Sequence, residues 1–512
     1  MRRVRIGSES WGRGCSLKPS KALAFAALAF AALGLAGAAV LAGCKPVGPD
    51  YHRPVYTAPP NYKEIGAPTV TAPPNPQGGS WQPASPSDGM LKGKWWEIYQ
   101  DPKLNEFEER IATENPSLRQ ALETYLATRD QIAVARANLF PTLSAGPSVS
   151  HDKNSANRPL FTSSTKTNYN DLVLEGEGSW EPDFWGRVRR TVEAAHENAQ
   201  ASAADMANID LTLQAQLATA YFQLRGADSL IQLLDSTVKD LESQLDLTQR
   251  RLKGGVATEV DVAQAETQLE TIRAQRVDAE QARAQFEHAV GAIANYPLPS
   301  FSIPFSPLEN TPPNVPLGVP SQLLERRPDI AAAERRTAAS NAQIGIAVSA
   351  YYPTISLGGT GGFESTHGGT WLQGPSALWS LGGQATELLF DAGQRHALTD
   401  QARHSYEAQA NAYKNTVILA FQDVEDQLAS LRVVEHEAVV ERLAVDSAQH
   451  SFDVSNQRYK GGVTSYLEVL TAEQVLLQNQ QTDVGLQTRQ FVSSVGLVRS
   501  LGGGWDATQL PK

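Results

Sequence analysis

RLKGGVATEVDVAQAE at residues 251–266 recurs as RYKGGVTSYLEVLTAE at 458–473, which lies 207 residues further along the chain. A longer stretch, 116–146, recurs at 328–358. Neither alignment needs a gap. A repeat of this length is no short solenoid unit, so it predicts a whole supersecondary assembly used twice. The two halves are expected to occupy quasi-equivalent places in one structure.

Heptad spacing outward from the first glycine pair predicts a long coiled-coil helix. Apolar residues fill both seam positions over five to six heptads: Leu213, Leu217, Ala220, Leu224, Ala227, Ile231, Leu234, Val238, Leu241, Leu245 and Leu252. No proline interrupts 186–252 or 393–459, so each range is expected to form one helix of 67 residues, roughly 100 Å long. The glycine pairs at 254–255 and 461–462 are expected to end these helices, and a returning helix follows each pair.

Apolar and polar residues alternate with a period of two in the segment before each long helix. This alternation predicts β-hairpins at 142–182 and 354–388, with 151–170 and 364–376 as external loops. Bacterial barrels start at about eight strands, and an open sheet in lipid leaves its edge groups unpaired. Several chains must therefore share a barrel if these strands span a membrane. The alternative from pattern alone is a small soluble β-domain on a coiled coil.

The first 43 residues predict a cleaved lipoprotein signal. Six Lys or Arg precede an apolar run at 22–42, which leads into Leu41-Ala42-Gly43-Cys44. This string resembles a bacterial lipobox, which implies that Cys44 becomes the first residue and carries lipid such as palmitate. A single transmembrane helix is the alternative, because the run is long enough to span hydrocarbon. Removing six basic residues and one acidic residue takes the net charge from −11 to −16, which argues against nucleic acid as a partner.

Proline-rich and repeated stretches divide the rest of the chain. An extended N-terminal segment at 44–110 precedes the first repeat at 111–296. A proline-rich connector at 297–327 leads to the second repeat at 328–502, and 503–512 forms a C-terminal tail. The fold class is therefore expected to be mainly α, with long coiled-coil helices and a smaller β portion.

Signatures of enzymes are absent from the sequence. The nine His fall singly, without the spacing of metal sites, and neither a nucleophile elbow nor a P-loop is present. The glycine run at 358–362 lies in a predicted strand with no basic residue after it, so it favours strand curvature over phosphate binding. We expect no catalytic residue, no metal and no cofactor apart from the lipid on Cys44.

Seven strings resemble the TolC-like outer-membrane efflux proteins, in the OprM/NodT lipoprotein subgroup. They are CKPVGPDYHRP (44–54), KWWEIYQDPKLNEF (94–107), SWEPDFWGRVRR (179–190), PSQLLERRPDI (320–330), LFDAGQRHA (389–397), FQDVEDQLASLR (421–432) and LGGGW (501–505). The resemblance covers nearly all of the mature chain. It implies a homotrimer with a periplasmic α-helical barrel, an equatorial domain that begins within 44–110, and a shared 12-stranded outer-membrane β-barrel, four strands from each chain.

The resemblance also implies a function. It is the passive export of drugs or other small toxic molecules through the outer membrane of a Gram-negative bacterium. The partners would be a periplasmic adaptor (membrane fusion) protein, an inner-membrane RND-type transporter and outer-membrane lipid. Two alternatives stay open: a structural coiled-coil lipoprotein without a pore, and a duct for secreted protein or one dedicated metabolite.

The resemblance places a gate at the periplasmic mouth of the duct. It implies that Leu467 belongs to an apolar ring and Glu468 to an acidic ring, and Asp261 is the repeat mate of Glu468. We expect both acids two turns inside the returning helices, where three copies would make a negative constriction. The alternative is that they are solvated acids that stabilise helix N-termini. The chain departs from the pattern that the resemblance implies at two places. Thr471 stands where the family has a second acid, and Gln474 lies near the position of that acid's basic partner.

The two glycine turns are candidate adaptor contacts. The residues concerned are Arg251, Lys253, Gly254, Gly255, Arg458, Lys460, Gly461 and Gly462. The alternative is that the basic side chains among them only stabilise the helix C-termini.

Overall fold

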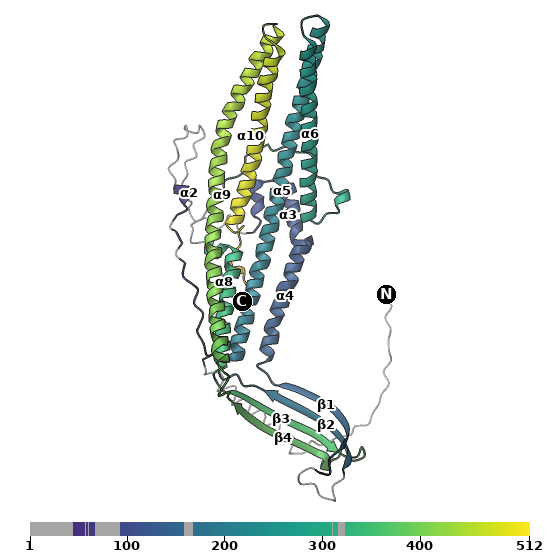
Figure 1. Ribbon diagram of the computed structural model, residues 1–512, viewed down its shortest axis with the longest axis vertical. Helices are drawn as coiled ribbons and strands as arrows, with labels where there is room; N and C mark the ends of the chain where they lie inside the picture. Colours follow the sequence, from purple (N-terminus) through teal and green to yellow (C-terminus); the bar gives the residue numbers. More distant parts are fainter. Residues whose placement is uncertain are drawn as a thin grey trace. The chain divides into compact units, whose positions relative to one another are not determined.

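Figure 1 shows the computed structural model of the chain, which describes residues 45–56, 58–59, 61–66, 93–157, 167–309, 311–315 and 323–511. The predicted signal segment and Cys44 lie outside the described residues, as do parts of the N-terminal segment, of the first external loop and of the connector. The chain forms two compact units. We call them the sheet unit, with residues 45–49, 134–192 and 343–399, and the helical unit, with residues 50–133, 193–342 and 400–511.

The chain is mainly helical, with four strands. In order, the principal elements are α2 (Lys63–Gly66), η1 (Trp95–Tyr99), α3 (Pro102–Glu114), α4 (Pro116–Ala137), β1 (Thr142–Lys153), β2 (Asn168–Trp180), α5 (Arg187–Lys253), α6 (Glu259–Ile293), α7 (Leu323–Arg326), α8 (Pro328–Ser349), β3 (Thr354–Ser365), β4 (Ala377–Thr386), α9 (Gln394–Lys460) and α10 (Tyr466–Ser500).

Two helical hairpins make up most of the helical unit. α5 returns as α6 and α9 returns as α10, and both turns lie at the same end of the unit (Figure 1). The helices expected over 186–252 and 393–459 are α5 and α9, and each has 67 residues. Among the described helices, none combines the length and hydropathy needed to cross a membrane.

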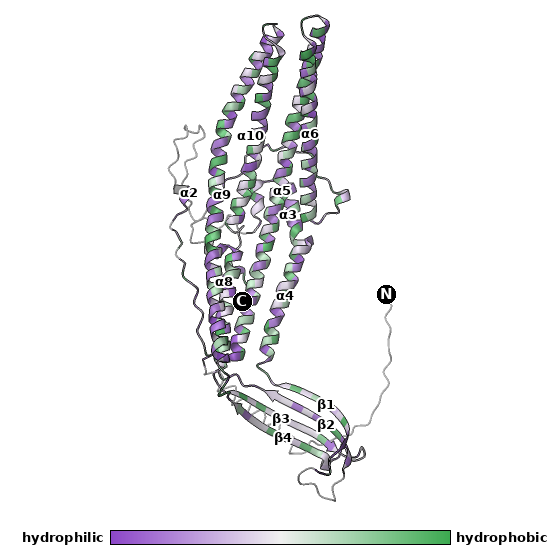
Figure 2. Ribbon diagram, viewed as in Figure 1, coloured by the Kyte–Doolittle hydropathy of each residue, from purple (hydrophilic) through white to green (hydrophobic). Residues whose placement is uncertain are grey.

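The heptad seam of α5 packs against both returning helices. Ile231, Leu234 and Leu241 form one buried cluster with Leu269 of α6 and Leu477 of α10. Figure 2 shows hydrophobic and hydrophilic residues alternating along the length of both long helices. Burial of each apolar side chain of the seam stabilises the hairpins by about 1.5–3 kcal/mol, so the seam fixes how α5, α6 and α10 lie together. The last predicted seam residue, Leu252, is 37 % exposed, because the packing ends before the final turn of α5.

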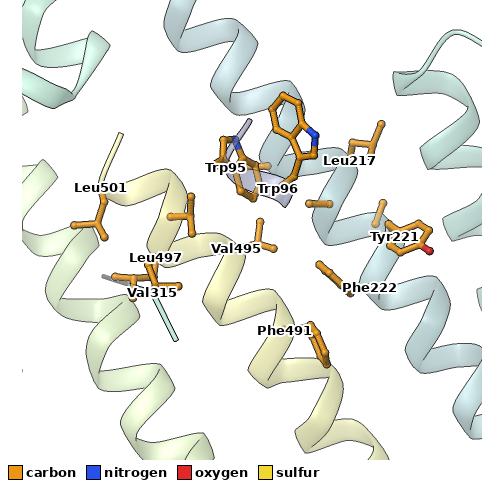
Figure 3. Close-up of a cluster of buried hydrophobic side chains, with 14 of the residues drawn as sticks. Trp95, Trp96, Leu217, Tyr221, Phe222, Val315, Phe491, Val495, Leu497 and Leu501 are labelled. Atoms are coloured by element: carbon orange, nitrogen blue, oxygen red, sulfur yellow. The ribbon is translucent and has the colours of Figure 1, made fainter. Parts of the chain in front are cut away.

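A second core lies where η1, α5 and α10 meet (Figure 3). Phe222 of α5 stacks on Phe491 of α10 with ring centroids 4.6 Å apart. Tyr99 lies 4.9 Å from the same Phe222 ring, and Trp95 packs edge-on against Tyr99. Offset and edge-on ring pairs add about 0.5–1.5 kcal/mol each beyond area burial. This cluster joins the first helical hairpin to the second.

The connector is clasped to the first hairpin by a buried charge network. Asp228 of α5, which is fully buried, accepts hydrogen bonds from Arg283 of α6 at 2.5 Å and from Arg225 at 3.3 Å. The same carboxylate accepts the backbone N–H of Ser306 at 3.0 Å. Arg225 also donates to the carbonyl of Pro304 at 2.7 Å. A buried charge needs such partners, so the network holds 303–308 against α5.

The second long helix holds α2 in a related way. Glu425 accepts the backbone N–H groups of Lys63 at 2.7 Å and Glu64 at 3.1 Å. Arg432 pairs with the Glu64 carboxylate at 2.5 Å. Arg432 lies 207 residues after Arg225 and is therefore its repeat mate. Each long helix thus carries one clasp, buried on α5 and half exposed on α9.

The four strands form one antiparallel sheet in the order β1-β2-β3-β4. β2 pairs with β3, so the hairpins of the two repeats lie side by side. The glycine run at 358–362 lies in the ladder of β3, where Gly359 opposes Gly178. Within the described chain, β1 and β4 each pair on one side only.

The register gives this sheet one apolar and one polar face. Leu143, Gly178, Gly359 and Leu381 lie in one row across the four strands, and directly opposed residues share a face. Leu143 is 86 % exposed, and Trp379, on the same face of β4, is 80 % exposed. The neighbouring row, on the other face, contains Ser144, Glu177, Thr360 and Ser380. A sheet with an exposed apolar face is incomplete as an isolated soluble unit.

Candidate functional site at the glycine turns

The first turn ends α5 with a C-cap built around Gly255. The Val256 N–H donates to the carbonyl of Arg251 at 2.9 Å, and the Gly255 N–H donates to that of Leu252 at 2.9 Å. Gly255 has a φ of 73°, in the left-handed region that glycine adopts without steric cost. Gly254 has no positive φ, so the cap does not require glycine at position 254.

The second turn repeats this geometry at the end of α9. The Val463 N–H donates to the carbonyl of Arg458 at 2.9 Å, and Gly462 has a φ of 75°. Lys460 and Gly461 are exposed, as are the corresponding Lys253 and Gly254 of the first turn. Both turns therefore present the same backbone shape and an exposed lysine.

The predicted gate residue Asp261 is engaged in capping α6. Its Oδ2 accepts the Thr258 N–H at 2.7 Å, and the Thr258 Oγ1 accepts the Asp261 N–H at 3.3 Å, which is a reciprocal capping box. Asp261 is the third residue of α6, so the expectation that it lies two turns inside was wrong. The reason is that α6 begins at Glu259, only four residues after Gly255. This geometry favours the helix-capping role for Asp261.

Glu468 and Leu467 lie differently, although Glu468 is also the third residue of its helix. Ser465, the residue before α10, makes no side-chain capping hydrogen bond. The Glu468 carboxylate lies 4.0 Å from Arg458, and both side chains are about half exposed. Leu467 is exposed, and Thr471 donates its hydroxyl to the Leu467 carbonyl at 2.8 Å. In the second repeat the carboxylate therefore takes no part in a capping box, unlike its mate Asp261 in the first repeat.

Arg251 ties the ends of the two hairpins together. It donates to the carbonyl of Tyr459 at 2.7 Å, and its guanidinium lies 4.4 Å from the centre of the Tyr459 ring. Tyr459 in turn packs against Tyr466 of α10, with ring centroids 5.6 Å apart. Burial raises the pKa of Tyr466, so its hydroxyl stays protonated. Arg251 thus has a partner within the chain, and Tyr459 and Tyr466 are site residues that the sequence analysis missed.

A buried carboxyl lies further along α10. Glu473 is 5 % exposed, and the side-chain amide of Gln244 on α5 donates to it at 2.9 Å. Nearby, the side-chain amide of Gln474 donates to Gln268 of α6 at 3.1 Å. Amide side chains thus link α10 to α5 and to α6 below the turns.

The two helical hairpins and the two-faced sheet define a class of protein. A family model described as outer membrane efflux protein matches residues 109–295 and 319–503, and each match contains one glycine turn. The chain belongs to this family and is an outer-membrane efflux channel, so the predicted family, fold class and function are confirmed.

Several known proteins are similar to this chain. The probable efflux pump outer membrane protein TtgC of Pseudomonas putida is 31 % identical over 448 residues, which cover 87 % of this chain and 92 % of the relative. The antibiotic efflux pump outer membrane protein ArpC of Pseudomonas putida matches equally well. The solved outer-membrane channel OprN has a TM-score of 0.81 at 27 % identity, over 90 % of this chain and 99 % of that one. The open state of the Neisseria gonorrhoeae MtrE channel has a TM-score of 0.76 at 26 % identity, with 90 % and 99 % coverage.

Proposed function

We propose that three copies of this chain form the exit duct of a tripartite efflux pump. The observation that carries this proposal is the two-faced sheet. Its apolar face, with Leu143 and Trp379, suits lipid, and its polar face, with Glu177 and Thr360, suits a water-filled lumen. β1 and β4 are open edges that only further strands can satisfy in a membrane. Four strands from each of three chains would close a barrel of 12.

The cargo we propose is small toxic molecules, including antibiotics and organic solvents. The support is similarity: ArpC is named for an antibiotic efflux pump and a TtgC of Pseudomonas putida for a toluene efflux pump. The duct itself would be passive, since the family is one of channel proteins. An inner-membrane RND-type transporter and a periplasmic adaptor protein would deliver the cargo.

The adaptor contact is proposed at the two glycine turns. Lys253 and Lys460 are exposed there and have matching surroundings, which would give one trimer six similar basic turns. Arg251 is less suited to an external contact because it already donates to Tyr459.

A gate is proposed at the first turn of α10. Leu467 and Glu468 are exposed in the single chain, and three copies around an axis would present an apolar and an acidic ring. Asp261 contributes at most indirectly, because its carboxylate is held in the cap of α6.

Lipid anchoring at Cys44 is the remaining part of the proposal. It rests on the LAGC string after an apolar run. Mass spectrometry of the mature N-terminus should find an acylated Cys44. A free thiol there would refute the anchor but not the duct.

Purified protein in planar lipid bilayers tests the duct. We expect a heat-sensitive oligomer that produces discrete conductance steps, and restoration of drug resistance in a host that lacks its own outer-membrane channel. Folded oligomers that never conduct would exclude a duct and favour a structural lipoprotein.

A further inference from the structure

The pair Glu473–Gln244 lacks a hydrogen-bond donor. Gln244 Nε2 of α5 donates to Glu473 Oε1 of α10 at 2.9 Å. The other carboxylate oxygen, Glu473 Oε2, and the amide oxygen, Gln244 Oε1, are both buried and accept from no group of the described chain. Both orphan atoms are acceptors, so one proton on the pair would give them what they lack. A carboxylic acid and an amide can exchange two hydrogen bonds in this way.

The surroundings of Glu473 disfavour its ionised form. Burial raises the pKa of Glu473 to about 7, the Gln244 hydrogen bond lowers it less, and Asp240 of α5 raises it further. On its own helix it lies near Tyr466, which is in turn influenced by Tyr459 of α9 and Asp261 of α6. Asp240 and Tyr466, the titratable groups coupled to Glu473 among the described residues, are both acids, so neither compensates a buried negative charge, and the nearby cation Arg251 of α5 is engaged with Tyr459.

We propose that Glu473 is a proton-binding site, and that the neutral acid pairs with Gln244 in both directions to latch α10 onto α5. Loss of the proton leaves a buried carboxylate with one amide donor and weakens this attachment. The latch lies five to six residues, about one and a half turns, along the same helix from Leu467 and Glu468. This step rests on the proposed duct and gate: deprotonation of Glu473 loosens the periplasmic mouth of the duct, and protonation closes it.

The internal repeat supplies a matched comparison. The mate of Glu473 is Glu266, 207 residues earlier, and the mate of Gln244 is Ser451. Glu266 is exposed in a shallow groove between α5 and α6 that Glu242 and Asp246 also line. The same acid in the same repeat position therefore has no latch, because its surroundings differ. Glu266→Gln removes one charge at a quasi-equivalent place and serves as the control.

The proton itself is the first readout, and it does not require a conducting channel. Infrared difference spectra of purified trimers should show a protonated carboxyl band at pH 6 that is lost by pH 8. The band should be missing in Glu473→Gln and present in Glu266→Gln. One pH unit on either side of the midpoint, the ionised fraction goes from about a tenth to about nine-tenths. A band that is unchanged in Glu473→Gln would overturn the proton site.

The dependence of folding stability on pH tests the same proton site, because proton binding by Glu473 is linked to folding. The pKa of Glu473 is raised from 4.5 to about 7 in the folded chain, so the folded state binds more protons than the unfolded state between these values. The contribution of Glu473 to stability is therefore fully present below pH 4.5 and is lost as the pH rises through 7. Glu473→Gln should flatten this part of the thermal-stability profile, and Glu266→Gln should leave it as in the wild type.

Conductance tests the consequence for the mouth. Wild-type channels in planar bilayers should rise in resting conductance between pH 6 and pH 8. Glu473→Gln, whose amide can still pair with Gln244, should stay at the low level throughout, and Glu266→Gln should follow the wild type. Channels that conduct while Glu473→Gln keeps the wild-type pH response would overturn the latch. A chain that never conducts would refute the duct instead, and the infrared band would still decide the proton site.

Discussion

Gly255 and Gly462 show how much a single backbone angle decides at the turns. Each has a φ near 75° and each caps a 67-residue helix, whereas Gly254 and Gly461 lie beside them with ordinary φ. A Cβ on Gly254 would meet only ordinary contacts, the nearest at 3.6 Å. The two glycines of a pair are therefore unequal, which the sequence motif does not reveal.

This inequality predicts different effects of substitution. Gly255→Val forces a β-branched residue into the left-handed region, at a cost of about 1–3 kcal/mol, so the turn should lose its shape. Efflux measured by drug susceptibility should be lost while trimers still form. Gly254→Ala is the control and should retain wild-type resistance. Equal resistance in both variants would count against the turns as the adaptor contact.

Asp261 and Glu468 are repeat mates with different environments, so we expect substitutions at the two positions to have different effects on stability and on channel selectivity. Asp261→Asn weakens a capping box, and loss of a cap costs about 0.5–2 kcal/mol, which should appear as a lower thermal stability. Glu468→Gln should leave stability within about 0.5 kcal/mol, because its ion pair is half exposed.

Channel selectivity distinguishes the two further. Glu468→Gln should reduce the cation preference of channels in planar bilayers and weaken block by multivalent cations, whereas Asp261→Asn should change neither. If Asp261→Asn alone alters selectivity, then the acidic ring lies in the first repeat and our placement of the gate is wrong.

The two clasps, one on each long helix, differ in burial. Asp228 is fully buried between two arginines, so Asp228→Ala takes the carboxylate partner from buried Arg225 and should cost about 3–5 kcal/mol. Arg432 is half exposed and pairs with Glu64, so Arg432→Ala should cost only about 0–1 kcal/mol. Thermal dissociation of the trimer measures both. Comparable losses in the two variants would mean that the repeats are clasped equally.

The long helices and their turns could be predicted because their signals are local. Heptads continue to Leu252 and a glycine pair follows, so α5 was placed within one residue. The seam also correctly named Ile231 and Leu241 as buried. The two-faced strands followed from alternation in the same way.

Other features depend on which helix lies beside which, and they could not be predicted. Arg251 meets Tyr459, and Glu473 meets Gln244, across more than 200 residues of chain. Tyr459 has no counterpart in the first repeat, where Leu252 stands, and this departure was the one signal available. The position of Asp261 in its helix was predicted wrongly because an acid shortly after a helix start fits both a capping box and a pore-facing ring, and the sequence alone does not distinguish the two.

The four-stranded sheet is the part of the molecule that most clearly requires further copies of the chain. Its apolar face is exposed and its two edge strands each pair on one side within the described chain. Other copies of the chain would supply both the missing strands and the closed lumen. The latch at Glu473 and the gate at Leu467 have a function only if such a lumen exists.

The most direct test is disulfide cross-linking between the two edges of the sheet. Ser144→Cys on β1 would be combined in turn with a cysteine at Ser380 or Gln384 of β4, all on the polar face. Oxidation of outer membranes should give a covalent trimer on denaturing gels for at least one pair, and each single cysteine should stay monomeric. Monomers from every pair, despite folded and membrane-inserted protein, would contradict a barrel shared by three chains.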